Sequence, residues 1–255
     1  MDVFLADLSP QLFVVTLAIA ILAGVIKGMV GFAMPMVMIS GLSTFLPPEL
    51  ALAGLILPTL VTNGMQSLRQ GVGAAIESIK TFRVFLIAGL VSLLISAQFV
   101  RVLPSEVMLL LIGVPVSFFA LLQLMGLKIS LPKRSLRVEA GVGGFAGVIG
   151  GLSGVWGPPT VLYLTALNTE KTEQMRVQGV IYGLGAVALF FAHIGSGVMR
   201  AETLPFSVAM VPPAVLGMWL GGKVQDRIDH AMFRKATLVV LTVAALNLVR
   251  RAVMG

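Results

Sequence analysis

The chain of 255 residues contains no cysteine, so it forms neither disulfide bonds nor thiolate metal sites and has no cysteine nucleophile. Charge is also scarce, because 11% of the residues are charged, whereas about 25% is usual in soluble domains. No aspartate or glutamate lies inside a long apolar run after Asp7, and the one serine in a glycine cluster, Ser153, does not fit a nucleophile elbow. We therefore expect no catalytic residue, no metal site and no enzymatic activity.

Hydrophobic residues make up 57% of the chain and the mean hydropathy is +1.00. A soluble core of this size cannot hide so much apolar surface, so the sequence predicts an all-α polytopic membrane protein with one integral membrane domain, residues 1–255. The net charge of +7 is spread between apolar runs and forms no basic face, so no nucleic acid is expected as a partner. No lysine or arginine precedes Lys27, and the basic region of a signal peptide is therefore missing.

Uncharged stretches of membrane-spanning length predict three full helices in each half of the chain. They lie near residues 50–69, 82–101 and 106–126, and near residues 173–198, 203–222 and 232–251. Two other apolar regions, residues 10–46 and 138–168, are too long for one straight membrane span and too short for two full-length spans. Each half is therefore expected to begin with a broken or re-entrant segment.

The two broken regions contain a repeated segment. Gly24–Pro35 and Gly147–Pro158 are identical at six of twelve positions, at an offset of 123 residues. A later similarity, at an offset of 124, matches Val91, Val100 and Met108 with Val215, Val224 and Met232. We interpret residues 9–126 and 137–254 as two repeats joined by a basic linker, residues 127–136, as in transporters built from internal repeats.

The distribution of lysine and arginine favours inverted repeats. If each broken segment returns to its own side, all the basic residues between spans lie on one side of the membrane except Arg101, Arg200, Arg250 and Arg251. A parallel arrangement would divide them far more evenly. The positive-inside rule therefore predicts both termini outside, in the cytoplasmic (inner) membrane of a bacterium.

A helix that breaks inside a membrane leaves unpaired backbone groups, which must face protein or a wet cavity. The half-helix after the break points N–H groups and its positive dipole end at the break, and this favours an anion. We predict one anion site between the two breaks, with free N–H groups around Gly31 and Gly154. The alternative is that these glycines, together with Gly28 and Gly151, only allow close helix packing.

Five further side chains are candidates for contact with the substrate. Lys27 lies in the first break, where its side chain either contacts the substrate or extends to the membrane–water interface. Asn63 and Gln66 share one helix face, and Gln178 and Tyr182 share a face of the equivalent helix; the amides bind substrate or link helices.

Two other residues have separate candidate roles. Trp156 could wall the pocket or donate its indole N–H. His193 is the one intramembrane histidine, a candidate proton relay or a hydrogen-bonded structural residue.

Together the eight apolar segments and the paired regions Gly24 to Pro35 and Gly147 to Pro159 resemble the sulfite exporter TauE/SafE family, also called the toluene sulfonate uptake permeases. The resemblance covers nearly the whole chain, and it departs at Lys27, where the second copy continues its glycine run with Gly150. It implies a secondary transporter for sulfite, a sulfonate, another organosulfur anion or a carboxylate.

We therefore expect a transporter that alternates access between its two repeats, with a small anion and the lipid bilayer as partners. We expect H⁺ or Na⁺ as the coupling ion and no other cofactor. The sequence leaves open whether the protein forms a homo-oligomer. No phosphate-binding Gly-x-x-x-x-Gly-Lys-Ser/Thr motif is present, so the chain has no ATP site of that type. The alternatives are a passive anion channel, a carboxylate transporter, and a membrane scaffold or sensor subunit.

Overall fold

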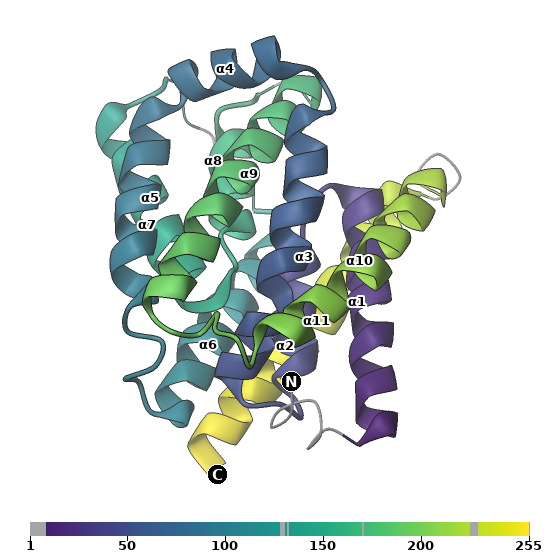
Figure 1. Ribbon diagram of the computed structural model, residues 1–255. Coiled ribbons are helices and arrows are strands. Elements are labelled where there is room, and N and C mark those ends of the chain that lie inside the picture. The colour runs from purple at the N-terminus through teal and green to yellow at the C-terminus, as the bar shows by residue number, and fades with distance from the viewer. Residues whose placement is uncertain (1–8, 128–130, 132, 170, 225–228, 255) are drawn as a thin grey trace.

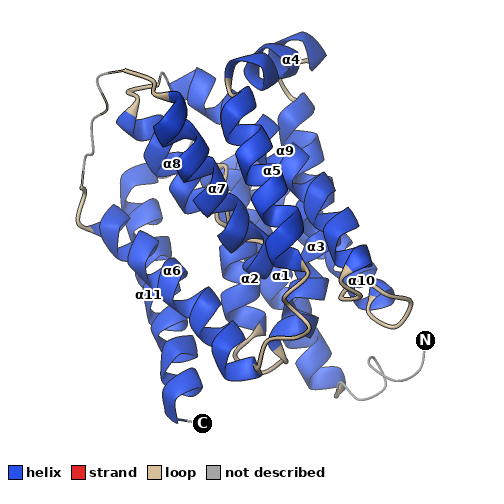
Figure 2. Cartoon of the chain, turned by 90° about the vertical axis from the view of Figure 1, so that its left-hand side faces the viewer, coloured by secondary structure: helices blue, strands red, loops and turns tan. Residues whose placement is uncertain are grey.

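The structure is a computed structural model that describes residues 9–254 apart from 128–130, 132, 170 and 225–228. Within these residues it contains helices and no strands (Figure 2). The helices are α1 (Pro10–Val30), α2 (Met34–Leu42), α3 (Pro48–Leu68), α4 (Val72–Thr81), α5 (Arg83–Ala97), α6 (Ser105–Leu124), α7 (Leu136–Ser153), α8 (Gly157–Ala166), α9 (Lys171–Gly195), α10 (Leu204–Val224) and α11 (His230–Met254).

Six of these helices are long and apolar enough to cross a membrane, and α4 with α5 makes a seventh if this pair, bent by 83°, is one span. The six spans lie in α1, α3, α6, α9, α10 and α11. This confirms the predicted all-α polytopic membrane fold. The helices also begin and end within a few residues of the predicted boundaries, with one exception.

That exception is the segment around α4 and α5. The predicted helix near residues 82–101 ends at Ala97, and a separate helix, α4, precedes it. Figure 1 shows α4 lying across the upper end of the bundle. The sequence prediction missed α4 because it measured gaps between charged residues, whereas α4 has ten residues and includes Glu77 and Lys80.

The chain enters and leaves the bundle at the same end. In Figure 1, α1 begins and α11 ends at the lower end, whereas α4 lies at the upper end. Arg134, just before α7, donates to the backbone carbonyl of Thr81 of α4, so Lys80 and Arg134 both lie at the upper end. Arg101, Arg200, Arg250 and Arg251 belong to connections and helix ends at the lower end.

Both glycine-broken segments are helical hairpins that turn back on themselves. In the first hairpin, Gly41 of α2 lies against Ile19 of α1, which precedes the break. In the second, Tyr163 of α8 stacks on Phe85, whose backbone N–H also donates to Glu139 in the first turn of α7. The turns at residues 31–33 and 154–156 are therefore the points at which the two hairpins reverse direction.

The first helix of each hairpin packs against a helix of the other half. On α1, Gly24 lies against Ala214 and Gly28 against Met218, so α1 runs parallel to α10. On α7, Gly143 lies against Phe85 and Gly147 against Gly89, so α7 runs parallel to α5.

The absence of side chains allows the backbones to approach this closely. A Cβ atom on Gly24 would lie 2.2 Å from the carbonyl oxygen of Ala214, and one on Gly147 would lie 2.1 Å from that of Gly89. Small residues in such positions are usual at helix contacts in membranes. The remaining long helices pair with their own counterparts, α3 with α9 and α6 with α11, so the contacts of the two halves are reciprocal.

Candidate functional site

Each hairpin turns at a glycine in the left-handed backbone region. Gly31 has φ 78° and ends α1, and Gly154 has φ 71° and ends α7. The N–H of Gly31 donates to the carbonyl of Lys27 at 2.8 Å, and the N–H of Gly154 donates to that of Gly150 at 2.7 Å. These two N–H groups therefore cap the helices that they end, and the predicted anion donors around Gly31 and Gly154 must be other N–H groups.

The helices that start after the turns offer fewer donors than expected. Pro35 lies in the first turn of α2, and Pro158 and Pro159 lie in the first turn of α8. Proline has no N–H group, so the first turn of α8 keeps the N–H of Gly157 as its main-chain donor. Before it, Val155 donates its N–H to the hydroxyl of Ser153 at 3.2 Å. Side chains must therefore supply much of the polarity at this point.

A small pocket, with a cavity volume of about 20 Å³, joins the two turns, although they are far apart in the sequence. It lies where α1, α3 and α9 meet the two breaks. Its lining residues are Lys27, Phe32, Ala33, Pro35, Met36, Asn63, Gly154, Val155, Trp156, Gly157 and Tyr182. The structure thus brings together Lys27, Asn63, Gly154, Trp156 and Tyr182 of the predicted set, and it places Gly31 in the turn beside them.

Lys27 supplies the charge of this pocket. Its side chain is 2% exposed, and its Nζ donates a hydrogen bond to Oδ1 of Asn63. The other end of that amide, Nδ2, donates to the backbone carbonyl of Tyr182 at 3.2 Å. Within the described part of the chain, no carboxylate lies within ion-pair distance of Lys27. Buried charges normally have a counter-charge. The ammonium group of Lys27 has none among the described residues.

The structure explains why the second hairpin has no lysine at the matching position. The repeat alignment pairs Lys27 with Gly150 and Ala33 with Trp156. A Cβ atom on Gly150 would lie 2.7 Å from Cε3 of Trp156, so the indole occupies the space that a longer side chain would need. At these two matched pairs, the first hairpin has its longer side chain at Lys27, before the turn, and the second has it at Trp156, in the turn.

Aromatic side chains form the walls of the pocket. Trp156 is 5% exposed and also lies against Gly185 of α9. The hydroxyl of Tyr182 donates to the backbone carbonyl of Gly157 at 3.3 Å and so ties α9 to the second turn. Trp156 thus has the wall position that the sequence predicted, and Tyr182 fixes the turn through its hydroxyl.

Gln66 and Gln178 are not part of the pocket lining, although both were predicted to contact the substrate. They lie one turn from Asn63 on α3 and from Tyr182 on α9, on the same helix faces. Both amide atoms of Gln66 and the Oε1 of Gln178 are buried without a hydrogen-bond partner in the described structure. Buried amides of this kind call for water or a ligand.

Three predicted residues lie away from the pocket. A Cβ atom on Gly28 would lie 2.2 Å from the carbonyl of Met218, and one on Gly151 would lie 2.1 Å from the hydroxyl of Ser96. Both glycines therefore serve helix packing, which was the alternative interpretation. His193 is fully buried outside the lining, with its Nδ1 3.1 Å from the hydroxyl of Ser196, so its role as a relay stays a prediction.

Sequence reasoning missed several lining residues: Phe32, Ala33, Pro35, Met36, Val155 and Gly157. All of them lie inside the two broken segments, and that position was the available signal. No cluster of three metal-ligating side chains occurs among the described residues.

Residues 16–248 match the family described as Sulfite exporter TauE/SafE. The chain belongs to this family. The match confirms the resemblance seen in the sequence, and no curated protein and no solved structure matches the chain. The TauE/SafE family is a family of membrane transporters, so the two facing hairpins belong to a multi-pass protein built for transport.

Proposed function

We propose that this protein is a secondary transporter that carries a small sulfur oxyanion, sulfite or a sulfonate, across the cytoplasmic membrane of a bacterium. The observation that supports this proposal is a buried lysine that has no carboxylate partner among the described residues, in a pocket lined by both hairpin turns. An anion would supply the missing negative charge. The family membership favours a sulfur oxyanion as that anion.

The pocket offers an arrangement of donors that suits a compact oxyanion. The ammonium group of Lys27 carries three N–H donors, and one of them is directed at Asn63. The others are free for oxygens of a ligand, together with the N–H of Gly157. The walls are aromatic and apolar, so a single positive charge holds the anion. Such a site binds selectively and still allows release.

We infer that the two halves are inverted and exchange shapes during transport. The α1–α2 hairpin begins at the lower end of the bundle, and the α7–α8 hairpin begins at the upper end (Figure 1). Each hairpin packs against a helix of the other half, so a rocking motion of one half moves both turns. None of the described lining residues is a carboxylate, so H⁺ or Na⁺ would couple through other groups.

Lys27→Met tests the site. Purified protein would be titrated with sulfite, a sulfonate and a carboxylate, and then assayed for uptake in proteoliposomes. Loss of the charge should weaken sulfite binding at least tenfold, or roughly 1.4 kcal/mol. The matched control is Lys80→Met, since Lys80 is exposed on α4. Equal binding by Lys27→Met and the parent protein would refute the site.

The same proteoliposomes distinguish a transporter from a channel. A coupled transporter should accumulate anion against its gradient only when a proton or sodium gradient is imposed. Flux that is indifferent to both ion gradients and only dissipates the anion gradient would favour a passive anion channel. Tighter binding of the carboxylate than of sulfite would change the substrate class but leave the role of Lys27 in place.

A further inference from the structure

A second and larger cavity, with a volume of about 280 Å³, lies between α1, α2 and α11. Its lining is almost entirely apolar and shares no residue with the Lys27 pocket: Ile19, Leu22, Ile26, Val37, Ser40, Gly41, Thr237, Val240, Leu241 and Ala244. Leu22 is 52% exposed and Val240 is 63% exposed, so the cavity opens on the outer surface of the helix bundle. In a membrane protein, that surface faces lipid.

The other half of the molecule has an aromatic ring at a position that matches this lining. The repeat alignment pairs Leu22 with Phe145, at the offset of 123. The ring of Phe145 packs on that of the buried Phe119, with centroids 5.7 Å apart.

A second matched pair shows the same difference in size. Ser40, on the wall of the cavity, corresponds to Tyr163, and both side chains are buried. The hydroxyl of Ser40 has no hydrogen-bond partner in the described structure. At two matched positions the first half thus has a smaller side chain on the cavity wall where the second half has an aromatic ring.

An empty volume of this size would forfeit the dispersion contacts of its walls, because protein interiors are close-packed. A cavity that opens toward the hydrocarbon has an apolar chain at hand to fill it. We propose that this cavity is a binding site for an acyl chain of an anionic phospholipid. This proposal goes beyond the transport function and does not depend on it.

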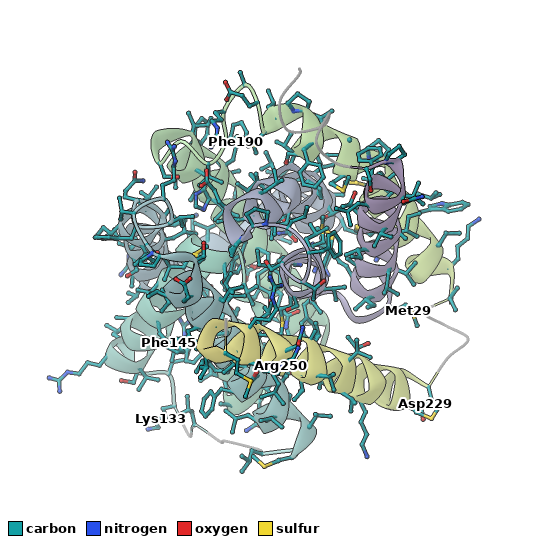
Figure 3. The ribbon with its side chains drawn as sticks, turned by 90° about the horizontal axis from the view of Figure 1, so that it is seen from below. Met29, Lys133, Phe145, Phe190, Asp229 and Arg250 are labelled. Atoms are coloured by element: carbon teal, nitrogen blue, oxygen red, sulfur yellow. The ribbon has the colours of Figure 1, made fainter. Side chains whose placement is uncertain are left out.

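The charge below the cavity selects the headgroup. The cavity follows α11 down to Ala244, and Arg250 and Arg251 come roughly 9 Å further along the same helix. Arg251 donates to the backbone carbonyl of Ser43, just beyond α2, at 2.5 Å. Figure 3 shows the molecule from below, with Arg250 labelled near the end of α11.

Neither arginine forms an ion pair with a carboxylate among the described residues. A phosphate at this level would therefore meet two unpaired positive charges while its acyl chain extends up into the cavity. Lipid tails elsewhere are as apolar as the cavity, so selectivity comes from its shape and from this charge.

The test uses phosphatidylglycerol with a photoreactive acyl chain, and the full-length protein reconstituted in nanodiscs. After illumination, labelled positions are mapped by peptide mass spectrometry. Labels should concentrate on residues 19–26, 37–41 and 237–244. The filling variant Leu22→Phe/Ser40→Tyr copies the second half at the two matched lining positions, and it should reduce labelling there at least roughly fivefold. Leu94→Phe is the matched control, since Leu94 is an exposed leucine of α5 away from the cavity.

Arg250→Gln tests the headgroup separately. It should reduce the preference for phosphatidylglycerol over phosphatidylcholine in a competition experiment while acyl-chain labelling persists. Labels spread evenly over all lipid-facing helices, or equal labelling of the filling variant and the parent protein, would overturn the proposal. An unchanged headgroup preference in Arg250→Gln would overturn the assignment of the phosphate. Thermal unfolding of each variant shows whether it is folded, and if the double variant does not fold, Leu22→Phe alone replaces it.

Discussion

Lys27 donates a hydrogen bond to the side-chain carbonyl of Asn63, which lies 36 residues later in the chain, on α3. The same amide donates from its nitrogen to the backbone of Tyr182 on α9, so its orientation is fixed by two partners. One neutral side chain thus positions the ammonium group and joins the first hairpin to both central helices. Because Asn63 is neutral, the positive charge of Lys27 stays available for a ligand.

Asn63→Asp should weaken anion binding. The carboxylate is nearly isosteric with the amide and would give Lys27 a counter-charge. It cannot donate to the carbonyl of Tyr182 as the amide does, so thermal unfolding of the variant is measured beside its affinity. Sulfite affinity should fall at least roughly tenfold, which calorimetric titration of the purified protein would measure. Asn63→Ala separates charge from geometry, because it removes the acceptor and adds no charge. If Asn63→Asp binds sulfite as tightly as the parent protein, Lys27 is not the group that holds the anion.

Gly154→Ala should destabilise the second hairpin. The left-handed backbone at φ 71° costs a residue with a side chain about 1–2 kcal/mol. The added Cβ would also lie 2.7 Å from a methyl group of Leu55. Thermal unfolding in detergent should show a lower midpoint. Gly144→Ala is the control on the same hairpin, since its Cβ would meet only the hydroxyl of Ser92 at 3.4 Å. Equal midpoints for the two variants would contradict the assigned turn.

Ala33→Gly should be tolerated, although Ala→Gly changes normally destabilise a protein. Ala33 has φ 77°, a conformation that disfavours side chains, so glycine relieves strain of about 1–2 kcal/mol. This gain offsets the backbone entropy cost of glycine, about 0.5–1 kcal/mol. We expect an unchanged or higher unfolding midpoint. Ala20→Gly, in the buried interior of α1, should lower it. A large loss of stability in Ala33→Gly would show that the turn is not strained.

Single cysteines should report opposite sides of the membrane for the two ends of the bundle. The chain has no cysteine of its own, so each introduced thiol is the one labelling site. A membrane-impermeant maleimide applied to intact cells should label Glu202→Cys and leave Glu77→Cys unlabelled until the cells are opened. Glu202 lies between α9 and α10, and Glu77 lies on α4. Labelling of both positions from the outside would rule out the inverted arrangement.

The sequence by itself determined the class of fold and the position of the two breaks. Long uncharged runs predict membrane helices because charge is costly in hydrocarbon. The repeated glycine segment located both turns, since a helix cannot continue through left-handed glycines followed by proline. Lys27, Trp156 and Tyr182 were singled out from these segments and their helix faces, and all three line the pocket.

Only the tertiary structure decided what each glycine and each polar group does. Spacing could not tell Gly28 and Gly151, which pack against α10 and α5, from Gly31 and Gly154, which form the turns. The partner of Lys27 comes from a distant helix, and the empty volume beside α2 depends on side chains from both ends of the chain. Such contacts arise from the packing of helices, because local periodicity fixes the face that a residue occupies but not the neighbour that this face meets.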